Sequence, residues 1–342
     1  MYTKQPKKLI IMNILEILRK YTDENHRLSQ KEIVDLLKRD YDMTVERKSI
    51  RRNINDLIDF GFEIEYKSSG ENEESQKMTD LYLVRDFADA ELRLLIDGLL
   101  FSKNIPNKQC KELITKIEGL SNVYFRSRMN HVHAIADDMP QNKQLFYTIE
   151  VLDEAISNQK QVSFFYNEYS TDKKLHPRVT DDGKERVYTM NPYAIAATNG
   201  RYYLICNNDK YDTVSNYRLD RITGIKMLNT PIKPMKEVKG LENGFDLPKH
   251  MAEHIYMYSG ESAVVNFSFD KRILNDLFDW FGNDITFLGE DGEYLNASVR
   301  VNLEAMRKWA LQYSLYVKVN SPGSLAENIK EDLKKACSNY GI

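Results

Sequence analysis

The chain has 342 residues, a formal net charge of −3 and a hydrophobic fraction of 42%, which is typical of a globular protein with roughly two or three domains. No stretch is apolar for long enough to span a membrane, and the N-terminus lacks a small-residue cleavage site, so we expect neither membrane association nor a signal peptide. Cys110, Cys206 and Cys337 are far apart, which argues against a disulfide framework and favours the reducing cytoplasm.

Residues 1–84 predict three helices followed by a β-hairpin. Apolar residues recur at helical spacing from residue 7 to residue 21. Ser29 and Glu32 form a capping box before the second helix, and Gly61 suits the end of the third. The expected strands are 62–66 and 81–84, joined by a polar loop at 67–79. This order is that of a winged helix-turn-helix DNA-binding domain.

Residues 85–160 predict a helical connector that positions this head. Its expected helices are 90–102, 106–120 and 146–157, with an irregular segment at 124–140 in which 131–136 could form a strand.

From residue 161 the periodicity changes from helical to alternating, and the sequence predicts a β-domain over 161–235. Turn signals lie at Asp181-Asp182-Gly183 and at Asn199-Gly200, the second being a strong hairpin signal. The expected strands are 162–166, 174–179, 186–197, 202–207 and 214–222.

Residues 260–342 predict the element order βαββαβ with a final helix, which is typical of a ferredoxin-like domain. The strands are expected at 263–269, 285–290, 294–301 and 315–320, and the helices at 271–281, 303–313 and 322–340. The fold class is therefore α+β.

Three features of residues 185–222 identify a family. Pro192-Tyr193 is followed by Gly200 and Tyr202-Tyr203-Leu204, and then by the run from Tyr217 to Ile222. This pattern resembles the WYL domain, an Sm-like or SH3-like β-barrel found mostly in bacterial transcription regulators, with Tyr202 in place of the family's tryptophan. The domains before and after it also resemble those of WYL regulators. The resemblance implies that residues 260–342 are the family's C-terminal extension, WCX, which it uses for dimerisation.

The third predicted helix carries the candidate DNA contacts. Four of the six residues from Arg47 to Arg52 are basic, and a recognition helix places its N-terminal half in the major groove. Ile50, Ile54 and Leu57 should face the core. The residues left for DNA are Arg47, Lys48, Ser49, Arg51, Arg52 and Asn55. A solvated charged face is the alternative. Acidic residues Glu71, Glu73 and Glu74 in the loop of the hairpin argue against phosphate contact there.

Arginines alternate with tyrosines in the predicted barrel, a composition that suits phosphates and stacked bases. The resemblance implies a nucleotide or single-stranded nucleic acid as the ligand. The candidate ligand-binding residues are Arg178, Arg186, Tyr193, Arg201, Tyr202, Arg218 and Arg221. Two structural alternatives stay open: Tyr203 and Leu204 in the barrel core, and Arg221 in an ion pair with Asp220 or a neighbour.

Two histidine pairs have spacings that occur at metal sites, namely His131 with His133 and His250 with His254. Neither has a third ligand nearby, so we interpret them as ordinary surface or core histidines and expect no metal or other cofactor. The GxSxG, Walker A, HExxH and GxGxxG motifs are absent, which argues against an enzyme.

The sequence thus predicts a cytoplasmic, homodimeric transcription regulator that binds a double-stranded operator and senses a nucleic-acid or nucleotide effector. One alternative is a nucleic-acid-binding accessory protein of a phage-defence system. The other is a nuclease or nucleotide hydrolase, which the lack of a metal-carboxylate motif disfavours.

Overall fold

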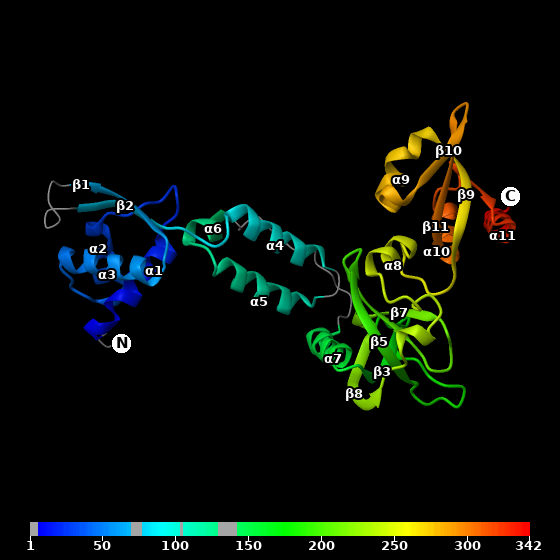
Figure 1. Ribbon diagram of the computed structural model, residues 1–342, viewed down its shortest axis with the longest axis horizontal. Helices are drawn as coiled ribbons and strands as arrows, with labels where there is room; N and C mark the ends of the chain where they lie inside the picture. Colours follow the sequence, from blue (N-terminus) through cyan, green and yellow to red (C-terminus); the bar gives the residue numbers. More distant parts are fainter. Residues whose placement is uncertain (1–5, 70–76, 103–104, 129–141) are drawn as a thin grey trace. The chain divides into compact units, whose positions relative to one another are not determined.

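The computed structural model describes residues 6–69, 77–102, 105–128 and 142–342. It is an α+β structure with helices and three antiparallel sheets among these residues. The chain divides into two compact units, Met1–Asp138 and Met139–Ile342 (Figure 1). No helix in the described ranges has the length and apolarity needed to cross a bilayer.

The first unit begins with three helices packed around one apolar core. Their sequence stripes, including Ile14, Ile33, Ile54 and Leu57, are buried against one another. The helices are α1 (Ile10–Tyr21), α2 (Gln30–Tyr41) and α3 (Arg47–Phe60).

Both expected helix boundary signals of this region are confirmed. The Ser29 hydroxyl accepts from the Glu32 amide at 3.3 Å, and the Glu32 carboxylate accepts from the Ser29 amide at 2.6 Å. Gly61 ends α3 with φ 115°, in the left-handed region that favours glycine.

A hairpin of β1 (Ile64–Ser69) and β2 (Lys77–Leu83) follows α3. The expected loop at 67–79 is too long, because Lys67 pairs with Thr79 and Ser69 with Lys77. These paired residues are mostly polar, so they lack the alternation that marks a strand with one buried face. The acidic residues Glu71, Glu73 and Glu74 lie outside the described residues.

The connector in the first unit contains α4 (Asp89–Phe101), α5 (Asn107–Glu118) and α6 (Val123–Arg128). The segment expected to be irregular from residue 124 begins as helix α6 instead. The strand considered at 131–136 lies outside the described residues.

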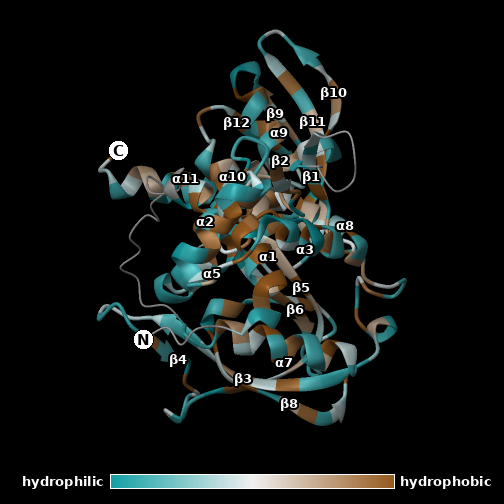
Figure 2. Cartoon of the chain, turned by 90° about the vertical axis from the view of Figure 1, so that its left-hand side faces the viewer, coloured by the Kyte–Doolittle hydropathy of each residue, from teal (hydrophilic) through white to brown (hydrophobic). Residues whose placement is uncertain are grey.

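The second unit starts with α7 (Leu145–Ser157), whose buried face includes Leu145, Leu152 and Ala155. Hydrophobic and hydrophilic residues alternate along its turns (Figure 2). A six-stranded antiparallel sheet follows, with the order β4-β3-β5-β6-β7 and β8 paired to β3. The strands are β3 (Lys160–Tyr169), β4 (Leu175–Pro177), β5 (Val187–Thr198), β6 (Arg201–Asn207), β7 (Val214–Arg218) and β8 (Ile222–Pro231).

Strand β5 joins two parts of this sheet. Residues up to Met190 pair with β3, and residues from Asn191 onward pair with β6. The expected turn at Asn199-Gly200 is confirmed: the φ values are 52° and 72°, as a type I′ hairpin requires.

The expected single strand at 214–222 is wrong. Residues Leu219–Arg221 form a 3-10 turn between β7 and β8. Strand β7 pairs with β6, whereas β8 pairs with β3. Leu219 and Asp220 are buried in this turn. A short helix, α8 (Leu247–Glu253), lies in the segment that leads to the C-terminal part and was also not expected.

The C-terminal part has the expected order of strands and helices. Its sheet is antiparallel throughout with the order β10-β11-β9-β12, and Phe267, Phe269, Leu277 and Trp309 lie in the core between the sheet and the helices. The elements are β9 (Ser262–Asp270), α9 (Leu274–Phe281), β10 (Thr286–Asp291), β11 (Tyr294–Asn302), α10 (Leu303–Gln312), β12 (Val317–Ser321) and α11 (Gly323–Asn339).

Candidate nucleic-acid and ligand sites

Helix α3 buries one face and exposes a cationic one. Arg47, Lys48, Arg52 and Asn55 are exposed, while the apolar residues of the same helix are buried in the three-helix core. The exposed cations lie within the first two turns of α3, and Asn55 follows in the third turn.

Two further candidates on α3 are less available. Ser49 is half-buried, and its backbone carbonyl accepts a hydrogen bond from the Asn53 side chain at 2.7 Å. Arg51 is half-buried and engaged within the chain. Arg47, Lys48 and Arg52 are therefore the cations best placed for a phosphate or a base edge.

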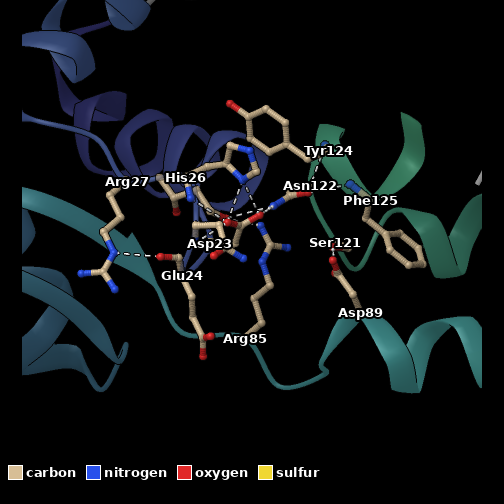
Figure 3. Close-up of polar contacts among 12 residues, drawn as sticks. Asp23, Glu24, His26, Arg27, Arg85, Asp89, Ser121, Asn122, Tyr124 and Phe125 are labelled. Carbon is tan, nitrogen blue, oxygen red and sulfur yellow. Dashed lines mark hydrogen bonds and ion pairs between the residues drawn. The ribbon is translucent and has the colours of Figure 1, made fainter. Parts of the chain in front are cut away.

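A joint between the α1–α2 loop and the connector holds the head in place (Figure 3). Asp23 Oδ1 lies 2.8 Å from Nδ1 of His26, and Asn122 donates to Asp23 Oδ2 at 2.6 Å. The His26 ring stacks on Tyr124 with centroids 3.5 Å apart. Arg85 donates to the carbonyls of residues 19 and 22, each at 2.7 Å, and so satisfies the C-terminal end of α1.

The electrostatics of this joint depend on Asp23. Burial would raise the pKa of its carboxyl, but hydrogen bonds from His26, Asn122 and two backbone amides outweigh burial and hold that pKa below its ordinary value. The joint therefore contains a stable carboxylate, and the same asparagine also accepts from the amides of Tyr124 and Phe125 at the start of α6.

In the six-stranded sheet, four aromatic rings form a cluster defined by Phe164, Tyr166, Tyr188 and Tyr217. Tyr166 and Tyr217 have centroids 4.9 Å apart, and Tyr188 and Tyr217 lie 5.6 Å apart. Their rings come from β3, β5 and β7, so pairing of distant segments builds the cluster. Burial raises the pKa of Tyr166 and of Tyr217, so both phenols stay neutral.

Arginines cover this aromatic cluster. The Arg178 guanidinium lies 5.3 Å from the Tyr166 centroid, and that of Arg186 lies 4.9 Å from the Tyr188 centroid. The Arg186 amide donates to the Arg178 carbonyl at 2.8 Å, so the two cations are neighbours.

The four arginines of this region differ in their partners. Arg178 pairs with Glu168, and Arg218 makes a two-pronged pair with Asp220, at 3.0 and 2.6 Å. Burial would lower the pKa of Arg218, but the Asp220 carboxylate outweighs burial and raises it. The ion pair considered between Arg221 and Asp220 is therefore wrong.

Arg186 and Arg221 have no carboxylate partner among the described residues. The Arg221 guanidinium lies 6.0 Å from the Tyr169 centroid, and its buried Nε has no hydrogen-bond partner within the part of the chain that the structure describes. Tyr169, Glu168 and Asp220 were not among the predicted site residues. In the sequence, the alternation of charged and aromatic residues is the signal that points to this region. Which arginine pairs with which carboxylate or ring follows only from the tertiary contacts.

The other candidate ligand residues are Tyr193, Arg201 and Tyr202. Tyr193 is 4% exposed, packs with Val238 and Leu241, and donates to the Lys233 carbonyl at 2.9 Å. Arg201 and Tyr202 begin β6 beside the Asn199-Gly200 turn and are half-buried. Tyr193 is thus engaged in packing.

The buried alternative holds for the two residues after Tyr202. Tyr203 is 8% exposed and packs with Met257 and Ile205, and Leu204 is fully buried.

His250 and His254 stack with centroids 4.0 Å apart at the side of β7. Nε2 of His250 lies 3.1 Å from Oδ1 of Asn216, and Nδ1 of His254 lies 2.8 Å from the His250 carbonyl. The described residues contain no group of three potential metal ligands. His131 and His133 lie outside the described residues.

Comparison with protein families decides what the six-stranded sheet is. Residues 147–227 match the family model of the WYL domain. The chain contains a WYL domain. The match extends from α7 to β8, and the Gln144 side chain that precedes α7 accepts from the Gly224 amide of β8 at 3.0 Å. Helix α7 thus packs as part of the WYL domain. The aromatic cluster and the arginines that cover it, Arg178 and Arg186, lie within the matched range.

Two solved structures are similar over most of this chain. Proteasome accessory factor B/C of Arthrobacter aurescens has 15% identity and a TM-score of 0.28 over 99% of this chain and 50% of that chain, so this chain spans half its length. A CRISPR Cas-related protein has 14% identity and a TM-score of 0.39 over 98% of this chain and 84% of that chain. Both likenesses are too remote to place a site. No protein of curated function matches.

Proposed function

We propose that this WYL-domain protein is a DNA-binding transcription regulator. Residues 1–84 would be a winged helix-turn-helix, the WYL domain an Sm-like barrel that senses a ligand, and residues 260–342 a ferredoxin-like domain that pairs two subunits in the cytoplasm. The single observation that carries the proposal is the exposed cluster of Arg47, Lys48 and Arg52 on α3, with Asn55 on the same helix. A symmetric dimer would read two half-sites of a palindrome.

The test of DNA binding compares Arg47→Ala with Arg52→Ala against a control. Duplexes selected from a random pool with the wild-type protein provide the probe for titrations at several salt concentrations. Loss of one base-reading arginine should weaken binding by about 5–150-fold, and loss of one phosphate contact should flatten the salt slope by about one unit. Lys226→Ala, an exposed cation on β8, is the matched control and should bind like wild type.

Equal affinity and equal salt slope for all three variants would exclude α3 as the reading helix. Diffuse binding across a genome, without discrete sites, would favour the phage-defence accessory protein. We propose a non-enzymatic role because no catalytic motif is present in the sequence. Metal-dependent cleavage of oligonucleotides or nucleotides would overturn it.

We further propose that the WYL domain binds a phosphate-bearing effector, either a nucleotide or a short single strand. Arg186 and Arg221 are the best phosphate ligands, because Arg178 and Arg218 already have carboxylate partners. Tyr169 lies beside Arg221 and could offer a ring to a base. An effector regulates DNA binding only if it prefers one of two arrangements of the protein.

Calorimetry with short single-stranded oligonucleotides and with cyclic dinucleotides tests this proposal. The variant Arg186→Ala with Arg221→Ala should lose at least tenfold in affinity, because two guanidinium contacts to phosphate are removed. Lys226→Ala, an exposed cation on β8 of the same domain, should bind normally. No heat with the wild-type protein means the effector class is wrong, and unchanged affinity of the double variant means the site is wrong.

A further inference from the structure

The outward face of α4 carries large apolar side chains. Leu94 is 76% exposed, Leu95 48% and Phe101 66%. Positions 94, 98 and 101 follow the spacing i, i+4, i+7, which places Leu94, Gly98 and Phe101 on one stripe of the helix. A solvated helix face normally carries polar residues at such positions, and a contiguous apolar stripe marks an interaction surface.

The connector also lacks a core of ordinary size. Among the described residues, its apolar cluster has three buried members, Leu92, Ile96 and Phe125. A helical layer that buries so few side chains needs a second layer for stability. Within the described residues of the first unit, the connector therefore combines an exposed apolar stripe with little apolar packing behind it.

Gly98 stands in the middle of this stripe. A glycine inside a helix is less favourable than an alanine, because its backbone loses more conformational freedom on folding. No described atom lies within 4 Å of the position that a Cβ would take at Gly98, so packing within the described chain does not explain the glycine. Close approach of another helix would explain it, since a missing side chain leaves a hollow for a neighbouring one.

We propose that a second copy of this chain packs against this stripe, with the two α4 helices crossing near Gly98. The stripe is self-complementary, because the bulky Leu94, Leu95 and Phe101 flank a hollow that can receive the same side chains of the partner. This surface goes beyond the proposed pairing of the C-terminal domains and adds a contact within the connector.

Charge distribution also favours a second copy. Helix α4 carries mostly acidic residues, whereas α5 carries mostly basic ones. The charged residues are Asp89, Glu91, Arg93 and Asp97 on α4, and Lys108, Lys111, Glu112, Lys116 and Glu118 on α5. When two such helix pairs meet across a two-fold axis, the acidic α4 of one copy can lie beside the basic α5 of the other.

The size of the stripe indicates how it acts. A stable interface buries roughly 1,200–2,000 Å² in total, which a few side chains per copy do not reach. The contact would therefore supplement another interface. Because Asp23, Asn122 and Arg85 join the head to the connector, pairing of the α4 helices would set the distance between the two heads.

Disulfide trapping of the full-length protein tests the contact. In a Cys337→Ser background the remaining native cysteines, Cys110 and Cys206, are buried. Helices packed about 8–10 Å apart, each with a Cα radius of about 2.3 Å, bring facing Cα atoms to about 3.5–5.5 Å, which overlaps the range for a disulfide. Gly98→Cys should form a covalent dimer on mild oxidation. The control Asp35→Cys, at an exposed position of α2, should not.

A second measurement keeps the test independent of the new cysteine. Sedimentation equilibrium should give Leu94→Glu a dimer dissociation constant at least tenfold larger than that of wild type, with an unchanged circular dichroism spectrum. A stable dimer that yields no Gly98→Cys disulfide would overturn the α4 contact and leave the C-terminal pairing intact. A monomeric wild-type protein at micromolar concentration would overturn both.

Discussion

At the scale of single residues, the partner of each cation decides what it can do. Arg178 and Arg218 look equivalent to Arg186 and Arg221 in the sequence, since all four stand among tyrosines. In the structure the first two are paired with Glu168 and Asp220. The Arg178–Glu168 pair is exposed, whereas the Arg218–Asp220 pair is largely buried, so removing one partner of the latter destabilises the fold. Loss of ligand binding in an Arg218 variant would therefore be ambiguous, whereas Arg186 and Arg221 can be tested without breaking an ion pair.

The histidine pair beside β7 predicts acid sensitivity of the second unit. Burial, and to a lesser extent the neighbouring His254, lower the pKa of His250 to about 3, and burial lowers the pKa of His254 as well. In the unfolded chain both imidazoles titrate near about 6.5. Below that pH the two imidazoles bind protons in the unfolded chain but not in the folded one. The free energy of unfolding therefore falls as pH drops from about 6.5, and the two histidines do not change it above that pH.

We expect the urea midpoint of wild type to decrease between about pH 7 and about pH 5, measured by fluorescence of Trp280 and Trp309, which lie in the second unit. His250→Gln keeps a donor for Asn216 and should reduce this decrease, because one titrating group is removed. The expectation fails if both proteins lose the same stability over this pH range.

At the scale of elements, helix ends and turns with strong local signals could be predicted from the sequence, whereas strand lengths with weak signals could not. The capping box at Ser29, the glycine stop at Gly61 and the Asn199-Gly200 turn each depend on backbone chemistry within a few residues, and all three are confirmed. The extra length of β1 and β2 was missed, because the paired residues are mostly polar and exposed.

Strand β8 shows why a continuous alternating pattern misled the prediction. Residues from Tyr217 to Asp220 alternate between apolar and charged side chains, as one strand would, yet the chain turns at Leu219–Arg221. Burial of Leu219 and the Arg218–Asp220 pair stabilise this turn, and both depend on the surrounding sheet. Gly224 in β8 has φ 61° and lies against Phe165, beside the point where the β3–β8 register shifts.

At the scale of the whole molecule, each unit has its own apolar core. Leu37 is fully buried in the three-helix core, and Leu277 is fully buried in the C-terminal core. Both tryptophans, Trp280 and Trp309, belong to the second unit. Tryptophan fluorescence therefore reports on one unit, while circular dichroism reports on helices of both.

We expect Leu37→Ala to destabilise the first unit by about 2–5 kcal/mol, the usual cost of a large-to-small change in a core. Its circular dichroism transition in denaturant should begin earlier, with an unchanged fluorescence midpoint. Leu277→Ala is the reciprocal control and should lower the fluorescence midpoint. A shift of the fluorescence midpoint in Leu37→Ala would mean that the two units unfold together.

The α+β class, the order of most elements and the WYL pattern follow from the amino-acid sequence alone, because helix periodicity, strand alternation and turn residues act over short distances. The sequence also indicated the exposed face of α3, since the same periodicity separates the buried Ile50 and Ile54 from Arg47 and Arg52. Only the tertiary structure decided that Arg218 pairs with Asp220, that Arg186 lacks a carboxylate partner among the described residues, and that Tyr193 is buried. Those outcomes depend on which side chains the assembled sheet buries and on the competition of several arginines for few carboxylates, even where the two partners, as Arg218 and Asp220, are close in sequence.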